Sequence, residues 1–173
     1  RMAGKGDQLP GRAFPPDGTW PTGTAKWEKR NVAQEIPVWD ADICLQCNKC
    51  VFVCPHAAIR AKVAEPAALK GAPTSLKSIK YKNTEYAGQE YLLQVAPEDC
   101  TGCGLCIEVC PAKDRKQPSC KALMATPLDL HREREREAFA FYETIPSAPL
   151  TGIEMEKRSA ALRLPLFEFS GAC

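Results

Sequence analysis

Ten cysteines are the residues of this 173-residue chain whose type and spacing could do chemistry. Eight of them fall in two runs of identical spacing, C-x2-C-x2-C-x3-C-P, at residues 44–55 and 100–111. Thiols this close together cannot easily all find distant disulfide partners, but as thiolates they can surround one small inorganic object. The first residues, 1–6, show no apolar secretory signal, so we expect a reducing compartment and metal ligation rather than disulfides.

A run of this spacing is typical of bacterial proteins with two [4Fe–4S] clusters, in which the fourth cysteine of each run ligates the other cluster. Two-residue spacers let one tight loop direct three thiolates at one cubane, and the three-residue spacer carries the fourth thiolate away. The sequence therefore predicts two crossed ligand sets: Cys44, Cys47, Cys50 and Cys110 for one cluster, and Cys100, Cys103, Cys106 and Cys54 for the other.

The residues between the cysteines fit this interpretation. Gly102 and Gly104 allow positive φ angles and a close approach of backbone amides to sulfur. Asn48 occupies the position of Gly104 in the first run, and asparagine is one of the few residues that tolerate the left-handed region. Amides that point at the sulfurs would offset the negative charge of a cluster and raise its potential.

A module held together by zinc is one alternative, since eight cysteines could supply four ligands to each of two ions. Zinc sites usually pair two distant knuckles, whereas here three thiols lie close together in each run. Ordinary roles are expected for Cys120 as a small thiol, for His56 and His131 as packed or solvated rings, and for Trp39 as a packing anchor. No nucleophile triad, phosphate-binding glycine loop or pair of catalytic carboxylates is apparent, so we expect electron transfer rather than bond making.

The cysteine spacing and the internal repeat predict an α+β fold, with a bacterial dicluster ferredoxin-like domain at residues 38–115 built as a pseudo-twofold βαβ repeat. Aligning the two runs gives six identities in twelve positions. An insertion at residues 64–90 separates the halves. Strand-like patterns occur at residues 36–39, 59–63, 79–82 and 91–95.

The flanks differ from this central part. Residues 1–37 contain five prolines and five glycines and predict an extended arm, with a short helix possible only at residues 26–35. Residues 116–173 predict a helical linker, whose helix starts after Thr126 as N-cap and ends by Ile145. The alternating charges of residues 131–137 are expected to form a solvated face.

Charge and hydropathy exclude other classes of protein. The 23 Lys and Arg residues nearly balance the 21 Asp and Glu residues, so no strong field exists to bind nucleic acid. No apolar run approaches the roughly 18 residues of a membrane-spanning helix. Because the chain starts without Met or a targeting segment, we expect an internal piece of a longer, cytoplasmic protein.

Phrases outside the cysteine runs carry a more specific signal. The sequence resembles the pyruvate:ferredoxin (flavodoxin) oxidoreductase family over essentially its whole length, in the phrases PDGTWPTGT (16–24), WEKRN (27–31), EIPVW (35–39), CVFVCPHAAIRA (50–61) and PLFEFSGAC (165–173). The resemblance implies the ferredoxin-like domain of a large homodimeric 2-oxoacid:ferredoxin oxidoreductase, or pyruvate synthase. Such an enzyme oxidatively decarboxylates pyruvate with coenzyme A on thiamine diphosphate and Mg, and three [4Fe–4S] clusters pass the electrons to ferredoxin or flavodoxin.

The family pattern carries over residue by residue. It implies that the eight cysteines of the runs bind the two clusters of this domain, and that Cys173 is the first ligand of the third cluster, nearest to the thiamine. Residues 116–173 would then lead into a thiamine-diphosphate-binding domain. Cys120 lies outside the pattern. The alternatives are a free-standing dicluster ferredoxin and an interaction module held together by zinc.

Overall fold

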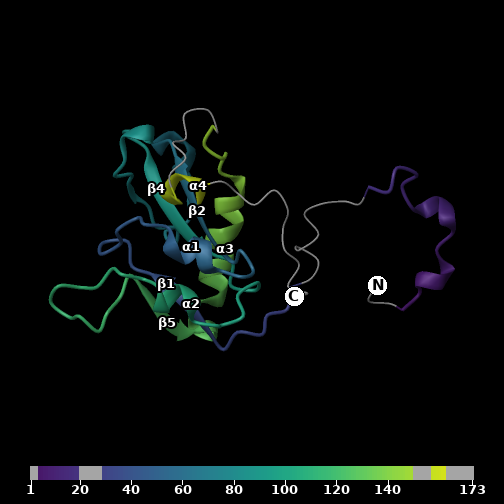
Figure 1. Cartoon of the computed structure of the whole chain (residues 1–173), viewed down its shortest axis with the longest axis horizontal. Helices are drawn as coiled ribbons and strands as arrows, with labels where there is room; N and C mark the ends of the chain where they lie inside the picture. The colour runs from purple at the N-terminus through teal and green to yellow at the C-terminus, as the bar shows by residue number, and fades with distance from the viewer. Residues whose placement is uncertain (1–3, 20–28, 150–156, 163–173) are drawn as a thin grey trace.

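The structure is a computed structural model that describes residues 4–19, 29–149 and 157–162. Its packed part consists of two antiparallel sheets and one long helix (Figure 1). The first sheet pairs β1 (Glu35–Trp39) with β5 (Leu123–Pro127). The second has the order β2 (Ile59–Ala64), β4 (Glu90–Val95) and β3 (Ile79–Lys80).

A short helix in each run begins after the second cysteine and contains the third. These are α1 (Lys49–Val53) and α2 (Leu105–Glu108), and they contact each other. Helix α1 also contacts β2, and α2 contacts β5, so each short helix rests on a different sheet. The two cysteine runs are therefore brought face to face between the sheets.

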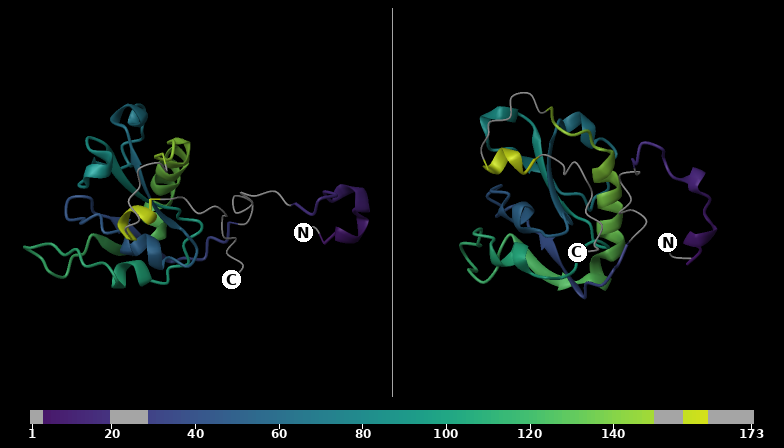
Figure 2. Two further views of the ribbon diagram at one scale, coloured as in Figure 1. Left: turned by 45° about the horizontal axis from the view of Figure 1, so that its top comes forward. Right: turned by 45° about the vertical axis from the view of Figure 1, so that its right-hand side comes forward.

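The long helix α3 (Leu128–Thr144) covers the other side of the sheets, away from α1 and α2 (Figure 2). It packs on β4 and β5, and its buried residues include Phe139 and Tyr142. The helix matches the expected range closely, but the predicted N-cap is wrong. Thr126 lies in β5 opposite Ile36, and Leu128 begins the helix with its N–H donated to the carbonyl of Gln34 at 2.9 Å.

Lys62 of β2 fastens the C-terminal end of α3 to the sheet. Its buried Nζ donates to the carbonyls of Tyr142 at 2.9 Å and Ile145 at 2.6 Å, and lies 4.6 Å from the centroid of the Tyr142 ring. Burial lowers the pKa of Lys62 to about 8. A cation at this end of a helix also complements the partial negative charge of the helix dipole.

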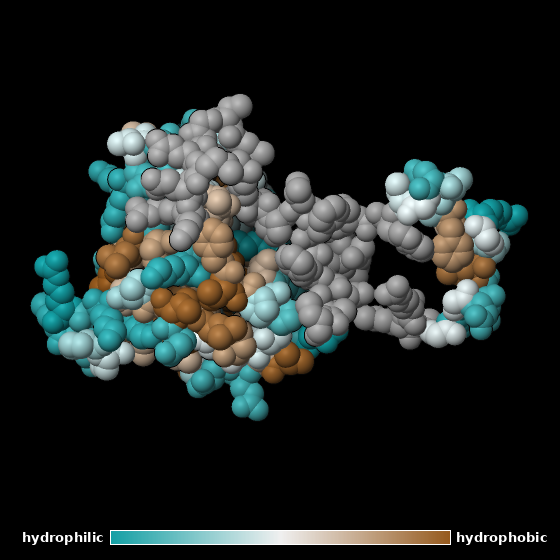
Figure 3. Space-filling model, in the orientation of Figure 1, coloured by the Kyte–Doolittle hydropathy of each residue, from teal (hydrophilic) through white to brown (hydrophobic). Residues whose placement is uncertain are grey.

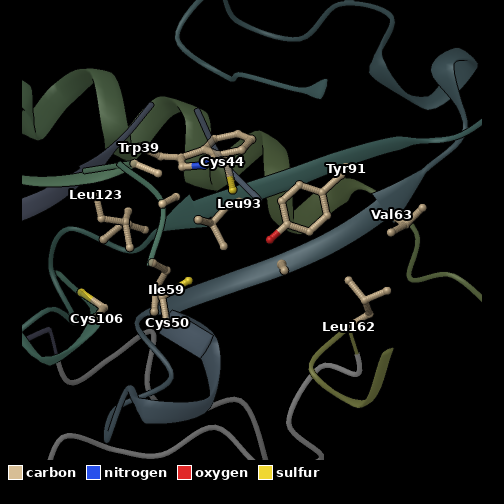
Figure 4. Close-up of a cluster of buried hydrophobic side chains, with 14 of the residues drawn as sticks. Trp39, Cys44, Cys50, Ile59, Val63, Tyr91, Leu93, Cys106, Leu123 and Leu162 are labelled. Atoms are coloured by element: carbon tan, nitrogen blue, oxygen red, sulfur yellow. The ribbon is translucent and has the colours of Figure 1, made fainter. Parts of the chain in front are cut away.

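The main hydrophobic core lies between the second sheet and the cysteine loops. It contains Trp39, Tyr91 and Leu93 together with the thiols of Cys44 and Cys50 (Figure 4). A smaller core under α3 is formed by Ala64, Leu92, Ala96, Phe139, Tyr142 and Ile145. Because thiols belong to the main core, any group that binds the cysteines also affects how this core packs.

The expected α+β class is confirmed, and strands lie at three of the expected stretches, 36–39, 59–63 and 91–95. The fourth, at 79–82, shortens to the two residues of β3. The insertion also contains the 3-10 turns η4 (Pro66–Leu69) and η5 (Thr84–Tyr86). Strand β5 and helix α3 follow residue 115, so the packed unit extends beyond the residues first assigned to the dicluster domain.

The N-terminal expectation needs one correction. Of the predicted short helix at 26–35, residues 29–34 form no helix and Glu35 begins β1. Residues 4–19 contain two exposed 3-10 turns, η1 (Gly6–Gln8) and η2 (Gly11–Ala13). Beyond α3, the short α4 (Lys157–Ala160) docks on the insertion, where the hydroxyl of Ser159 donates to Oε1 of Glu85 at 2.6 Å. Within the described ranges, no helix is long and apolar enough to cross a membrane.

Candidate metal centres

The cysteines of the two runs line two separate cavities. The first cavity is lined by Cys44, Cys47, Cys50 and Cys110, together with Trp39, Leu45, Asn48, Tyr91, Leu93, Ala112, Ala122 and Leu123. The second cavity is lined by Cys100, Cys103, Cys106 and Cys54, together with mostly small and apolar residues and His56. Each cavity therefore gathers three cysteines from one run and the fourth from the other run.

Left-handed residues shape both loops at the same two positions. In the first loop Gln46 has φ 54° and Asn48 has φ 57°; in the second, Gly102 has φ 71° and Gly104 has φ 75°. Asn48 and Gly104 immediately precede α1 and α2. The expectation that Asn48 takes the conformation of Gly104 is thus confirmed, and the two loops turn their thiols inward in the same way.

Backbone amides point at sulfur in both loops. The N–H of Gln46 donates to Cys44 Sγ at 3.4 Å, and the N–H of Gly102 donates to Cys100 Sγ at 3.4 Å. The N–H of Ala58 donates to Cys54 Sγ at 3.3 Å. Such donors stabilise negative charge on the sulfur, as a thiolate ligand requires.

Burial disfavours the thiolate form of the more buried cysteines, Cys44, Cys50, Cys100 and Cys106. Burial, followed by the charges of Cys100, Cys54 and Cys103, raises the pKa of Cys106 to about 12. Burial, and then the charges of Cys44 and Cys47, likewise raises the pKa of Cys50. Because metals bind thiolates, a positively charged group in each cavity would remove the protons and relieve the repulsion.

The donor sets fit a multinuclear cluster better than a single ion. Across residues 4–19, 29–149 and 157–162, no three His, Cys, Asp or Glu side chains come close enough together to hold one metal ion. A tetrahedral zinc site, with Zn–S bonds of about 2.3 Å, would need sulfurs roughly 3.8 Å apart. Four thiols spread around a cavity, with amides turned toward them, are what an iron–sulfur cubane requires.

The insertion encloses the first loop. Gln46 is 1% exposed; its Nε2 donates to the carbonyl of Lys80 at 2.7 Å and its Oε1 accepts from the N–H of Lys82 at 2.9 Å. Lys82 Nζ donates to the carbonyl of Cys44 at 2.9 Å. We call this set of contacts the Gln46 clamp. Sequence patterns indicated a strand near residue 80 but gave no sign of its partner.

A second polar contact fixes the first loop from β4. The hydroxyl of Tyr91 donates to Oδ1 of Asn48 at 2.6 Å, and both side chains are fully buried. The contact holds the residue whose left-handed conformation starts α1. Tyr91 was expected only as part of a strand, so its role in the cavity is a finding of the structure.

The second loop is more open. Cys103 and Leu105 of this loop are exposed. Leu45 and Phe52 of the first run also expose apolar side chains, and Figure 3 shows apolar surface on the face that carries α1 and α2. The second loop approaches β1 closely at one point. A Cβ on Gly102 would lie 3.2 Å from the carbonyl oxygen of Glu35.

The remaining sequence expectations can now be placed. Cys120 is half-buried and lines neither cavity; its backbone closes a loop with Asp114 and Gln117. Cys173 lies outside the described residues. The solvated-face expectation for residues 131–137 is wrong at Glu135, which is 9% exposed and accepts a hydrogen bond from Gln94 Nε2 at 2.7 Å. The charge pattern could not reveal this, because the partner comes from β4.

Comparison with known families agrees with the geometry. Residues 36–111 match the model of a 4Fe–4S dicluster domain, and residues 1–33 match a domain of unknown function. The central part of the chain is thus a dicluster domain of the iron–sulfur class.

Comparison with individual proteins is more specific. The chain is 57% identical to pyruvate-flavodoxin oxidoreductase of Nostoc sp. and 53% identical to the probable pyruvate-flavodoxin oxidoreductase of Escherichia coli, over 99% of its length in both cases. It is 45% identical to pyruvate:ferredoxin oxidoreductase of Moorella thermoacetica, over 98% of its length. The resemblance to the pyruvate:ferredoxin (flavodoxin) oxidoreductase family is therefore confirmed. The chain spans only 14% to 15% of the length of these relatives, which are enzymes.

Proposed function

We propose that this chain is the electron-transfer domain of a pyruvate:ferredoxin or pyruvate:flavodoxin oxidoreductase. Cys44, Cys47, Cys50 and Cys110 would hold one [4Fe–4S] cluster in the first cavity, and Cys100, Cys103, Cys106 and Cys54 a second in the second cavity. When bound, the clusters supply one-electron redox chemistry. The placement of eight thiols around two cavities, three from one run and one from the other, is the observation that carries this proposal.

The chain's own residues would hold the two centres rigid and dry. Because each run contributes to both cavities, ligation ties α1 to α2 across the middle of the fold. The core around Trp39, Tyr91 and Leu93 excludes water from the first cavity, and Ile36, Ile59 and Val95 line the second. Rigid surroundings limit the reorganisation that accompanies each transfer of an electron.

The wider role rests on the relatives. Their names indicate pyruvate as substrate and flavodoxin or ferredoxin as electron acceptor. We propose that electrons from the oxidative decarboxylation of pyruvate, with coenzyme A, thiamine diphosphate and Mg, reach a soluble carrier through this domain. The other domains of a cytoplasmic, homodimeric enzyme would be its immediate partners. Cys173 would be a ligand of a third cluster.

The proposal is tested by the metal content of anaerobically prepared protein. About eight iron and eight acid-labile sulfide per chain are expected, with interacting EPR signals after reduction. Cys110→Ser should lower the iron content and remove the interaction between the signals, whereas Cys120→Ser should leave both unchanged. Zinc without sulfide would overturn the proposal and leave a structural module.

A further inference from the structure

The first cavity contains a buried hydrogen-bond donor without a partner. Trp39 lines this cavity and is 6% exposed, and its indole Nε1 has no hydrogen-bond partner among the residues that the structure describes. Buried N–H groups are almost always paired, with protein or with something bound there. An unpaired one at the wall of a cavity therefore points to what the cavity holds.

The indole faces the sulfur of Cys44. Figure 4 shows its nitrogen beside that sulfur. Trp39 and Cys44 line the same cavity, and both side chains are buried. The indole N–H is thus placed to donate to a negatively charged sulfur at this position.

The ring is held in this orientation from three sides. It packs edge-on against Tyr91, with ring centroids 6.0 Å apart and an interplanar angle of 70°. The backbone of Trp39 pairs with Leu123 in the first sheet, and its carbonyl accepts from Lys77 Nζ at 2.9 Å. The direction of the N–H is thus set by β1, β4 and the insertion rather than by a flexible loop.

The second cavity has a different side chain at the matching place. Trp39 precedes Cys44 by five residues, and Val95 precedes Cys100 by five residues. Val95 lines the second cavity just as Trp39 lines the first, but it has no side-chain donor. His56 also lines the second cavity, with a buried and unpaired Nδ1, yet an imidazole nitrogen can accept as well as donate. Of these two side chains, only the indole of Trp39 is a hydrogen-bond donor in every protonation state.

We propose that Trp39 is a positioning residue that donates a hydrogen bond from its indole N–H to the Cys44 sulfur of the cluster in the first cavity. The inference rests on the proposed function, because it needs a cluster there. A donor to a ligand sulfur stabilises the extra electron of the reduced state and makes the potential less negative. Trp39 therefore makes the first centre easier to reduce and does not act on the second.

The test is Trp39→Phe in the full chain, loaded with iron and sulfide. Phenylalanine keeps an aromatic ring against Tyr91 but removes the N–H. In a potentiometric titration followed by EPR, one of the two reduction steps should move to a more negative potential while the other stays. Tyr142→Phe is the matched control, because it removes a buried, unpaired hydroxyl from the smaller core and should move neither step.

A second measurement does not depend on the variant folding well. In a chain with Trp20→Phe and Trp27→Phe, indole-15N labelling marks Trp39 alone, and pulsed EPR of the reduced protein should detect coupling of that nitrogen to a cluster. Absence of the coupling, or unchanged potentials in a Trp39→Phe protein with full iron content, would overturn the role of Trp39. A protein without iron would instead defeat the proposed function.

Discussion

The two cavities have the same cysteine spacing but are built differently. Side-chain contacts hold the first cavity: Gln46 bonds to the insertion, and Asn48 accepts a hydrogen bond from Tyr91. The Trp39 side chain lines the cavity. Around the second, Gly102 and Gly104 take the corresponding left-handed conformations. There the loop packs against the backbone of β1.

The difference shows two solutions to one backbone requirement. A left-handed residue is costly unless it is glycine or is held by specific contacts. In the first loop, buried hydrogen bonds offset the conformational strain of the left-handed residues. The same contacts place polar groups near the sulfurs. The second loop has little such strain because its left-handed residues are glycines. It remains open, with Cys103 exposed. We therefore expect the first loop to keep part of its structure without a metal and the second loop to lose its structure.

Removing iron is the strongest test of this comparison. Chelation under anaerobic, reducing conditions should abolish the cooperative thermal transition of the domain, because the buried thiols then lose what holds the two runs together. Hydrogen exchange on the apoprotein should show fast exchange throughout residues 100–110 and partial protection of residues 44–50, through the Gln46 clamp and the second sheet. Equal exchange in both loops would contradict the comparison.

Breaking the Gln46 clamp should make the first loop resemble the second. Gln46→Ala removes two part-buried hydrogen bonds and leaves the carbonyl of Lys80 and the N–H of Lys82 without these partners. The expected loss of unfolding free energy is about 2 to 3 kcal/mol, measured by urea denaturation of the loaded protein. Gln89→Ala makes the same change elsewhere in the insertion and should lose less than about 0.5 kcal/mol. Similar losses in both variants would show that the clamp is not specific.

The glycines of the second loop offer a finer test. Gly102→Ala should reduce the unfolding free energy by about 2 kcal/mol, because it adds a Cβ close to Glu35 to the left-handed strain. Gly104→Ala has the same strain, but its Cβ meets no atom within 4 Å, and it should lose only about 1 kcal/mol. The same denaturation experiment ranks the two, and the reverse order would contradict the close approach to β1.

Spacing and periodicity predicted much of this molecule. Apolar stretches predicted the strands that contain Ile36 and Tyr91, and alternation predicted the strand that contains Ile59. The grouping of the cysteines around two cavities agrees with the crossed sets inferred from the cysteine spacing. The strands could be predicted because their patterns are local, and the crossed sets because this cysteine spacing is typical of proteins with two clusters.

The features that were missed depend on contacts between distant segments. Strand β5 has two exposed residues in succession, Met124 and Ala125, so it lacks the alternation that would have revealed it. Thr126 has the composition of an N-cap, but pairing with Ile36 draws it into the sheet instead. Glu135 seemed one of a row of solvated charges because Gln94, its partner, is 41 residues away.

The pairing of β1 with β5 has a consequence for how such a unit fits into a longer chain. Glu35, where the strand begins, lies directly opposite Pro127, where the other strand ends. The chain thus enters and leaves the region of both cavities at adjacent positions, because the start of β1 pairs with the end of β5. A unit with adjoining ends can be carried within a larger protein while its neighbours on either side remain next to each other.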